Sequence, residues 1–374
     1  MCFSIVVCLI RSGAFRLRNP FTLPLLVPTI FLAVGMLANG YTTPNYYYMN
    51  FVWGLGVFVS LGVLFYVFYL GMQDEDPEEL IAYFTFLTFV ISWILILEMA
   101  HGVVHSGWIQ DGRIVRGAVH MGYGVNNLVA YNISMLIPIN MYGFMKSRHP
   151  MACLLTAVLL YVATLISMSR NSILFGGLFF LVSFITAMFF GERKRLARIC
   201  FAVLISGAAI LLFTSSEALR TLFGSMIDKG MSDSGRYSIW EQCYYLFLDY
   251  PIFGAGFFGL KFGSSDFLPL HIVPEFAHNT VFQLIGTTGI VGFAGYAFYR
   301  LATLKRILTG VNIEKWMFGL GYLILAGESL LDNYVFNFYT AFYPVAALAI
   351  LVLLDKDQQD VRRAESYFIR HWRS

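Results

Sequence analysis

The ionisable residues that could carry chemistry in this chain are few, and they stand beside apolar segments. They are Arg170, Arg236, His278, Glu328 and Asp332. Histidine has an unperturbed pKa of about 6.5, so it can exchange a proton near neutral pH. Arginine keeps its charge and presents forked donors that suit anionic oxygens. Such residue types favour proton transfer and anion binding, provided that the elements around them bring them into position.

The sequence around the histidine combines a polar start with a glycine-rich apolar run. His278 and Asn279 precede nine residues without a charge, and Gly289 follows them. Asn279 is well placed to cap a helix. At a rise of 1.5 Å per residue, Gly289 lies roughly 16 Å along that helix from His278. Glycines recur every third residue from Gly286 to Gly295 and predict a packing surface, which a rigid helix separates from the histidine.

The composition places these residues in a membrane protein. Of the 374 residues, 58% are hydrophobic and 13% are charged, which is about half the charged share of a soluble protein. Apolar stretches near the ~20 residues that cross a hydrocarbon core recur along the chain. We predict an all-α polytopic membrane protein with about ten transmembrane helices, at 22–39, 51–70, 80–100, 127–145, 151–169, 172–190, 199–214, 279–299, 313–331 and 334–354.

Basic residues fall mainly on one side of these spans. With the N-terminus inside, eighteen of the 25 Lys and Arg residues lie in inner segments and seven in outer ones. Cytoplasmic loops are enriched in Lys and Arg, so both termini are predicted to be cytoplasmic. The net charge of +3 reflects this sidedness and is no argument for nucleic-acid binding. The apolar run at 2–10 is too short to span and follows no basic stretch, so a cleaved signal peptide is not expected.

A large outer loop, residues 215–278, is predicted between spans seven and eight of a single membrane domain that covers residues 1–374. It should contain a helix that ends near Asp249, because Pro251 follows. The helix has one apolar stripe, formed by Trp240, Cys243, Tyr244, Phe247 and Leu248. Its aromatic residues suit the membrane interface, and packing on the ends of the spans explains them equally well. Cys243 is the one cysteine predicted outside, and no structural disulfide is expected.

Two further patterns match known sites only formally. The stretch GAGFFG at 254–259 fits the GxGxxG dinucleotide fingerprint, but it follows a predicted helix where the fingerprint needs a strand. A glycine-permitted turn is therefore favoured. Glu98, His101 and His105 could share one helix face, as a metal site would require, yet glycines interrupt that helix. Hydrogen-bonded groups at a helix end are favoured there, and neither a metal nor a cofactor is predicted.

Three stretches, taken in order along the chain, resemble the bacterial O-antigen ligase and polymerase superfamily, which includes Wzy-type polymerases and WaaL-type ligases. Ser169-Arg170-Asn171 resembles the family's arginine at the outer end of a span. Gly235-Arg236-x-x-x-Trp240, followed by Pro251-Ile-Phe-Gly254-Ala-Gly256, resembles its large periplasmic loop. His278-Asn279, nine residues and then Gly289-x-x-Gly292 resembles its signature. The resemblance covers roughly residues 110–350.

The resemblance implies a fold and a reaction. Family members are metal-independent, inverting glycosyltransferases of the GT-C type that use sugars carried on undecaprenyl diphosphate. By this resemblance His278 is the base for the acceptor hydroxyl, and Arg170 and Arg236 hold the diphosphate. Glu328 and Asp332 are candidates for orienting the acceptor or pairing with an arginine. The expected partners are the lipid-linked glycan donor, a glycan or lipid acceptor and membrane lipid, at a bacterial inner-membrane site that faces the periplasm.

Several functions stay open at this point. The first hypothesis is polymerisation of O-antigen or other surface-polysaccharide repeat units, and its nearest alternative is a ligase that moves finished glycan to lipid A-core or another acceptor. A transporter or flippase would predict inverted repeats and broken helices with polar groups at mid-depth, and neither is evident in the sequence. A noncatalytic scaffold would leave the outer Arg and His residues without a role. For His278 alone, a structural position at a helix start is the alternative.

Overall fold

The computed structural model describes residues 22–42, 49–72, 74–105, 109–110, 113–114, 120–121, 124–214, 236–256, 277–332 and 343–355. The chain divides into two compact units. Unit 1 comprises Met1–Leu80, Arg236–Val311 and Ser329–Ser374, and unit 2 comprises Ile81–Gly235 and Asn312–Glu328. That the two units form a single membrane domain stays a prediction.

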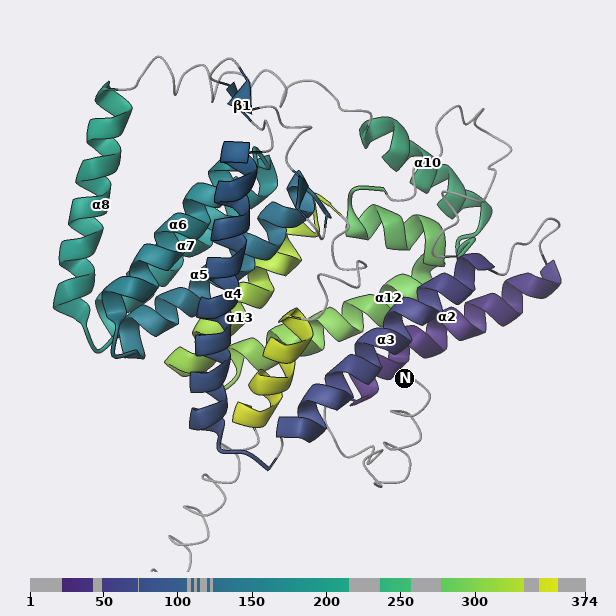
Figure 1. The fold of residues 1–374 in the computed structure, drawn as a ribbon. Coiled ribbons are helices and arrows are strands. Elements are labelled where there is room, and N and C mark those ends of the chain that lie inside the picture. Colours follow the sequence, from purple (N-terminus) through teal and green to yellow (C-terminus); the bar gives the residue numbers. More distant parts are fainter. Residues whose placement is uncertain are drawn as a thin grey trace, which may run out of the picture. The chain divides into compact units, whose positions relative to one another are not determined.

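Nine of the predicted spans overlap a helix of the structure, and the tenth, 334–354, overlaps the helix Tyr343–Asp355 in its described part (Figure 1). In unit 1 these helices are α2 (Thr22–Thr42), α3 (Met49–Met72), α12 (Thr280–Leu308) and Tyr343–Asp355. Unit 2 holds most of α4 (Pro77–His105) together with α5 (Asn126–Lys146), α6 (Pro150–Ile166), α7 (Arg170–Phe190), α8 (Lys194–Thr214) and α13 (Ile313–Glu328). Two short antiparallel pairs precede α5: β1 (Ile109–Gln110) with β2 (Arg113–Ile114), and β3 (His120–Met121) with β4 (Gly124–Val125).

Five helices in the described part of the chain are long and apolar enough to cross a membrane. They are Leu55–Met72, Pro77–His105, Asn127–Lys146, Arg170–Phe190 and Thr280–Leu308. The prediction of a helical, multi-pass membrane protein is therefore supported, whereas the number of ten spans stays a prediction. Of the predicted outer loop, only 236–256 and 277–278 are described, and the run at 2–10 lies outside the described residues.

The helix α12 is broken near its middle, so the interpretation of a rigid helix behind His278 is wrong. Gly289 has φ 62° and ψ −168° and thus leaves the helical conformation. Such a left-handed backbone is readily adopted only by glycine. A Cβ atom at Gly289 would lie 2.5 Å from the carbonyl oxygen of Ile252, so a side chain has no room there. A broken helix, which was not evident in the sequence, is therefore present.

The segment that follows α10 (Arg236–Asp249) supplies acceptors to the backbone groups freed by this break. The amide of Ile290 donates to the carbonyl of Pro251 (3.0 Å), and the amide of Val291 donates to the carbonyl of Ile252 (3.1 Å). Inside a bilayer no water is present to accept these bonds, and an unsatisfied amide costs several kcal/mol. The segment after α10 is therefore part of the structure of α12.

Gly286 and Gly295 of the stripe bring helices close together, as predicted, whereas a Cβ atom at Gly292 would meet the side chain of Thr288 in its own helix. A Cβ atom at Gly286 would lie 2.9 Å from the Cα atom of Cys243 in α10. One at Gly295 would lie 3.1 Å from the Cα atom of Pro28 in α2, which runs alongside α12 (Figure 1). Small residues allow such close approach of two backbones inside a membrane.

The helix α10 ends at Asp249, as the following proline predicted, but its buried face differs from the predicted stripe. Buried or partly buried side chains on that face belong to Ile239, Trp240, Cys243 and Leu246. Of the predicted stripe, Trp240 and Cys243 lie on this face, whereas Tyr244 and Leu248 are exposed. The face is set by packing against α12, where Gly286 accommodates Cys243. Its position at a membrane interface stays a prediction.

The helix α5 is the centre of unit 2. It is almost entirely buried and packs against α6, α7 and α13. Hydroxyl and amide groups along α5 bind neighbouring helices: Ser134 donates to Glu328 of α13 (2.8 Å), and Asn140 donates to Ser92 of α4 (2.8 Å). By contrast, α4 exposes large apolar side chains such as Phe86, which suits contact with lipid.

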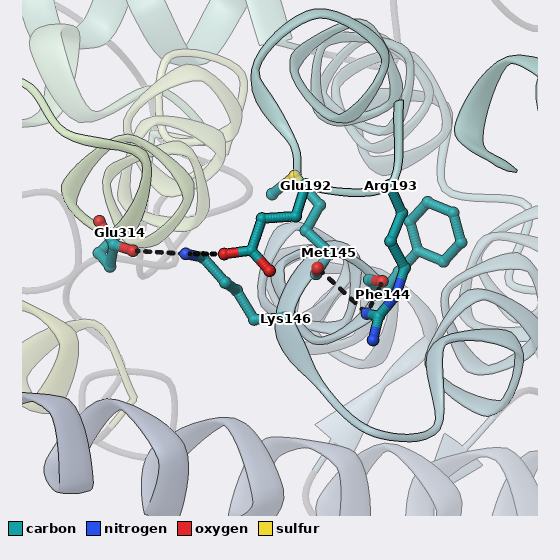
Figure 2. Close-up of polar contacts among 6 residues, drawn as sticks. All are labelled: Phe144, Met145, Lys146, Glu192, Arg193 and Glu314. Carbon is teal, nitrogen blue, oxygen red and sulfur yellow. Dashed lines mark hydrogen bonds and ion pairs between the residues drawn. The ribbon is translucent and has the colours of Figure 1, made fainter. Parts of the chain in front are cut away.

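Polar contacts at one end of unit 2 join α5, α7 and α13 (Figure 2). Lys146 ends α5, and its Nζ lies 2.7 Å from Glu192 Oε1 and 3.7 Å from Glu314 Oε1. Arg193 donates to two carbonyls in the last turn of α5, at 3.1 and 3.2 Å. Cations at a helix C-terminus satisfy carbonyls that have no partner within the helix. Segments that the topology prediction put on the same side of the membrane are thus brought to the same end of the unit.

The packing of the segment after α10 on α12 generates a stability prediction. Gly254 has φ 69°, and a Cβ atom there would collide with the carbonyl of Thr287. We expect Gly254→Ala to lower the free energy of unfolding by about 2 kcal/mol or more, because it adds a clash to a strained conformation. The measurement is thermal unfolding of the detergent-purified protein. Gly62→Ala in α3, where nothing lies within 4 Å, is the control and should be neutral or stabilising. Equal melting temperatures for the two variants would contradict the packing.

Candidate functional site

A histidine and a carboxylate from distant parts of the sequence meet at the start of α12. His278 Nδ1 lies 2.9 Å from Asp332 Oδ1, and both residues belong to unit 1. The imidazole is 46% exposed, whereas the carboxylate is 8% exposed. The pair therefore consists of a nearly buried carboxylate and an accessible ring.

Two hydrogen bonds to backbone carbonyls join the residues after His278 to the residues before Asp332. Asn279 Nδ2 donates to the carbonyl of Leu330 (2.7 Å), and the amide of Thr280 donates to the carbonyl of Ser329 (3.0 Å). Asn279 Oδ1 also accepts from two amides in the first turn of α12, at 2.8 and 3.1 Å. The predicted helix cap is confirmed, and the same side chain joins the start of α12 to the segment that carries Asp332.

The backbone at His278 is strained and held on both sides. His278 has φ 51°, in the left-handed region, which costs a non-glycine residue about 1 kcal/mol or more. Ala277 is fully buried, and its carbonyl accepts from Trp240 Nε1 (2.9 Å) while its amide donates to Gln283 Oε1 (2.6 Å). Side chains from α10 and α12 thus fix the peptide before His278, and strain of this kind is concentrated at functional sites.

Aromatic side chains join α10 to the first turn of α12. The rings of Trp240 and Phe282 stack at 5.0 Å with an interplanar angle of 10°. Tyr237 meets Trp240 edge to face at 5.4 Å. Arg236, the first residue of α10, is half-buried one helical turn before Trp240. The spacing Arg-x-x-x-Trp therefore places Arg236 one helical turn from Trp240, the side chain that anchors α10 beside His278.

This geometry can remove a proton from a hydroxyl. When Asp332 accepts a hydrogen bond from Nδ1–H, the neutral imidazole has its lone pair on Nε2. The carboxylate also stabilises the imidazolium that forms when Nε2 takes up a proton. Asp332 was a candidate for orienting the acceptor or pairing with an arginine, and in the structure its Oδ1 contacts His278.

The remaining candidates, Arg170 and Glu328, lie in unit 2. Arg170 is half-buried as the first residue of α7, and Glu328 is fully buried as the last residue of α13. The two carboxylate oxygens of Glu328 accept hydrogen bonds from Ser134 (2.8 Å) and Ser172 (2.7 Å). The structure thus brings Asp332 to His278 in one unit and places Glu328 among serine hydroxyls in the other.

The formal motif matches behave as helix and turn features. The rings of His101 and His105 lie 4.9 Å apart in α4, but no group of three His, Cys, Asp or Glu side chains that could hold a metal occurs in the described part of the chain. Gly254 and Gly256 have φ 69° and 98° in a turn that follows a helix, so the favoured turn is confirmed. The third glycine of that motif lies outside the described residues.

The family model described as O-Antigen ligase matches residues 155–297. This match supports a relationship to the O-antigen ligase/polymerase superfamily. The match runs from α6 into α12 and includes Arg170, Arg236 and His278, whereas Glu328 and Asp332 lie beyond it. No curated protein matches the chain. Together with the apolar helices, this match supports a multi-pass membrane protein and, at a general level, an enzyme of polysaccharide biosynthesis.

Sequence reasoning missed the side chains that support the candidate residues. Gln283 and Trp240 bind the peptide before His278, and Ser134 and Ser172 bind Glu328. A signal for Gln283 was present, because a polar amide stands near the start of a predicted span, where it needs a partner. Serines within apolar helices carry little signal, since a serine hydroxyl can also bond to its own helix backbone.

The thiol of Cys243 is buried in the folded protein. Its side chain is 1% exposed beneath Gly286, and burial raises the pKa of the Cys243 thiol to about 12. The thiolate is the reactive form of cysteine, so such burial suppresses alkylation and oxidation. The outer position that the sequence predicted for this cysteine therefore does not make it a redox site.

This burial generates a labelling prediction. In a variant that keeps Cys243 and replaces the other four cysteines by Ser, a membrane-impermeant maleimide should fail to label at neutral pH until the protein is denatured. The control is a cysteine-free variant with Leu248→Cys, on the exposed face of the same helix, which should label rapidly in cells. Equal labelling of both would contradict the packing of α10 on α12.

Proposed function

We propose that this protein is a metal-independent, inverting glycosyltransferase that acts at the periplasmic face of a bacterial inner membrane. Its donor is glycan carried on undecaprenyl diphosphate, and its reaction polymerises repeat units of O-antigen or another surface polysaccharide. The observation that carries the proposal is the His278–Asp332 pair, whose histidine lies in the segment that matches the O-antigen ligase family. An exposed imidazole held by a nearly buried carboxylate supports proton transfer from an acceptor hydroxyl.

In the proposed step, Nε2 of His278 takes the proton of the acceptor hydroxyl while the acceptor oxygen attacks the anomeric carbon of the donor. The bond between that carbon and the diphosphate oxygen breaks, and its electron pair leaves with the diphosphate. Attack from the face opposite the leaving group inverts the configuration. Asp332 holds the imidazole in the required tautomer and stabilises its protonated form.

The diphosphate gains negative charge as the bond breaks, and Arg170 and Arg236 are proposed to bind it. Guanidinium groups keep their charge and donate two parallel hydrogen bonds to phosphate oxygens. Interactions that strengthen with the developing charge lower the barrier of the chemical step. Each arginine begins a helix, α7 or α10, and Trp240 anchors the first turn of α10.

The alternative reaction is ligation of finished glycan to lipid A-core or another acceptor. A strain that lacks the gene distinguishes the two, because loss of a polymerase leaves single repeat units, whereas loss of a ligase leaves full-length glycan on the carrier lipid. Transporters also contain broken helices. Here the amides of Ile290 and Val291 at the break bind carbonyls of the chain itself, so the break supports packing of the segment after α10.

The base generates the first functional prediction. His278→Ala should lower the initial rate of glycan transfer in isolated membranes by about 100-fold or more, with the amount of protein unchanged. Asp332→Asn should lower it by about tenfold, because a neutral amide does not stabilise the imidazolium. His101→Ala, which alters an exposed histidine of α4, is the control and should keep the rate. Transfer at the wild-type rate in His278→Ala would rule out the proposed base.

The proposed diphosphate contacts of the arginines generate a second functional prediction. Arg170→Lys and Arg236→Lys should each raise the KM for the lipid-linked donor by about tenfold, because a point charge does not replace a fork of donors. The matched control is Arg195→Lys on an exposed position of α8, which should behave as wild type. Wild-type kinetics in both test variants would remove the proposed diphosphate contacts.

A further inference from the structure

Glu328 is a buried carboxylate whose place in unit 2 is defined by serine hydroxyls. It is 0% exposed at the end of α13, between helices α5 and α7 that are apolar enough to span a membrane. A charge there is expensive unless hydrogen bonds surround it, and by default it indicates a functional site. Ser134 of α5 donates to Oε1 (2.8 Å), and Ser172 of α7 donates to Oε2 (2.7 Å). Each oxygen of Glu328 therefore binds a different neighbouring helix, so this carboxylate joins α13 to α5 and to α7.

The hydroxyl of Ser172 also accepts a hydrogen bond from Ser169, the residue before Arg170. Ser169 Oγ donates to Ser172 Oγ (3.2 Å), and Ser169 is 2% exposed. The direction of the bonds is consistent, since Ser169 donates to Ser172 and Ser172 donates to the carboxylate of Glu328. A carboxylate can only accept, so it sets the direction of the whole chain.

The backbone of this turn is unusual and needs such support. Met168 has φ 57°, in the left-handed region that residues other than glycine rarely adopt. The Ser167 hydroxyl donates to the carbonyl of Thr164 (2.6 Å) and accepts from the amide of Ser169 (3.2 Å). The chain therefore reverses within three residues and enters α7 at Arg170, with serine hydroxyls holding both sides of the turn.

Close helix packing surrounds the carboxylate. A Cβ atom at Gly176 of α7 would lie 3.2 Å from the Cβ atom of Ser134 in α5. One at Gly327, next to Glu328, would lie 2.7 Å from the ring of Phe175 in α7. A packed interior of this kind does not adjust when a bond is lost, so a change at Glu328 is passed to the first turn of α7.

We propose that Glu328 is a positioning residue for the donor: through Ser172 and Ser169 it fixes the first turn of α7, and with it the direction in which Arg170 leaves the helix. This inference rests on the proposed function of Arg170 in binding the diphosphate. It differs from a direct role of Glu328 in orienting the acceptor, because here Glu328 acts through the hydroxyls of Ser172 and Ser169.

The experiment measures initial rates of transfer from the lipid-linked glycan that accumulates in a strain lacking this gene, with purified full-length protein. Glu328→Gln and Ser172→Ala should each raise the donor KM by about fivefold or more and leave kcat less affected. Ser183→Ala is the matched control, because Ser183 is also a buried serine of α7 but donates only to Phe179 of its own helix. It should behave as wild type.

A double-mutant cycle separates positioning from general support of the fold. If Glu328 acts through Arg170, then Glu328→Gln added to Arg170→Lys should raise the donor KM little further, since coupled residues are not additive. Independent structural damage would multiply the two effects and would overturn the proposal. Ser172→Ala keeps the carboxylate and removes only the link, so it tests the idea even where Glu328→Gln fails to fold.

The outcomes also separate this inference from the proposed function. Absence of transfer by the wild-type protein would overturn both. Active wild-type protein, an impaired Arg170→Lys variant, and wild-type donor KM in Glu328→Gln and Ser172→Ala would overturn the role of Glu328 alone.

Discussion

Backbone amides inside a membrane need acceptors from the protein itself, and the region around His278 depends on how this need is met. The helix α12 breaks at Gly289, and the carbonyls of Pro251 and Ile252 bind the amides that follow the break. Those carbonyls belong to the segment directly after α10, so satisfying the break also holds α10 against the first half of α12. Trp240 of α10 can then bind the peptide before His278.

Because of this arrangement, His278 does not depend on its own helix alone. Its strained backbone is held by Trp240 and Gln283, while Asp332 fixes the ring. The accessible ring is therefore carried by buried supports, which is how proteins keep a reactive side chain in one orientation. Loss of a support is expected to reduce chemistry before it unfolds the unit.

In unit 2, polar side chains inside the helix bundle also need partners from the protein, and other side chains supply them. Its central helix α5 carries polar groups where a lipid-facing helix would carry apolar ones, and each group needs a partner from a neighbouring helix. Ser134 reaches Glu328 toward one end of α13, and Lys146 reaches Glu314 at the other (Figure 2). The polar contacts thereby fix the register of α5 and α13, which dispersion contacts between apolar side chains define less sharply.

Much of this could be read from local sequence. Long apolar runs predicted the positions of the helices, Asn279 predicted a cap, and Pro251 predicted the end of α10, because length, capping and proline geometry act within a few residues. The prediction failed where a tertiary contact competes with local preference. Gly289 was expected within a rigid helix, but the helix breaks there, and the segment after α10 accepts hydrogen bonds from the amides of Ile290 and Val291. Which face of α10 is buried could not be predicted, because packing of Cys243 against Gly286 selects it.

The sequence by itself indicated the membrane class, the helical segments and the resemblance to the superfamily, because apolar length and motif spacing are properties of the chain read in order. Only the tertiary structure decided the partners of the candidate residues. Asp332 meets His278 across 54 positions, and Glu328 meets Ser172 and Ser134 across 156 and 194. No local pattern encodes such pairs, since which side chains meet depends on the rotation and register of packed helices.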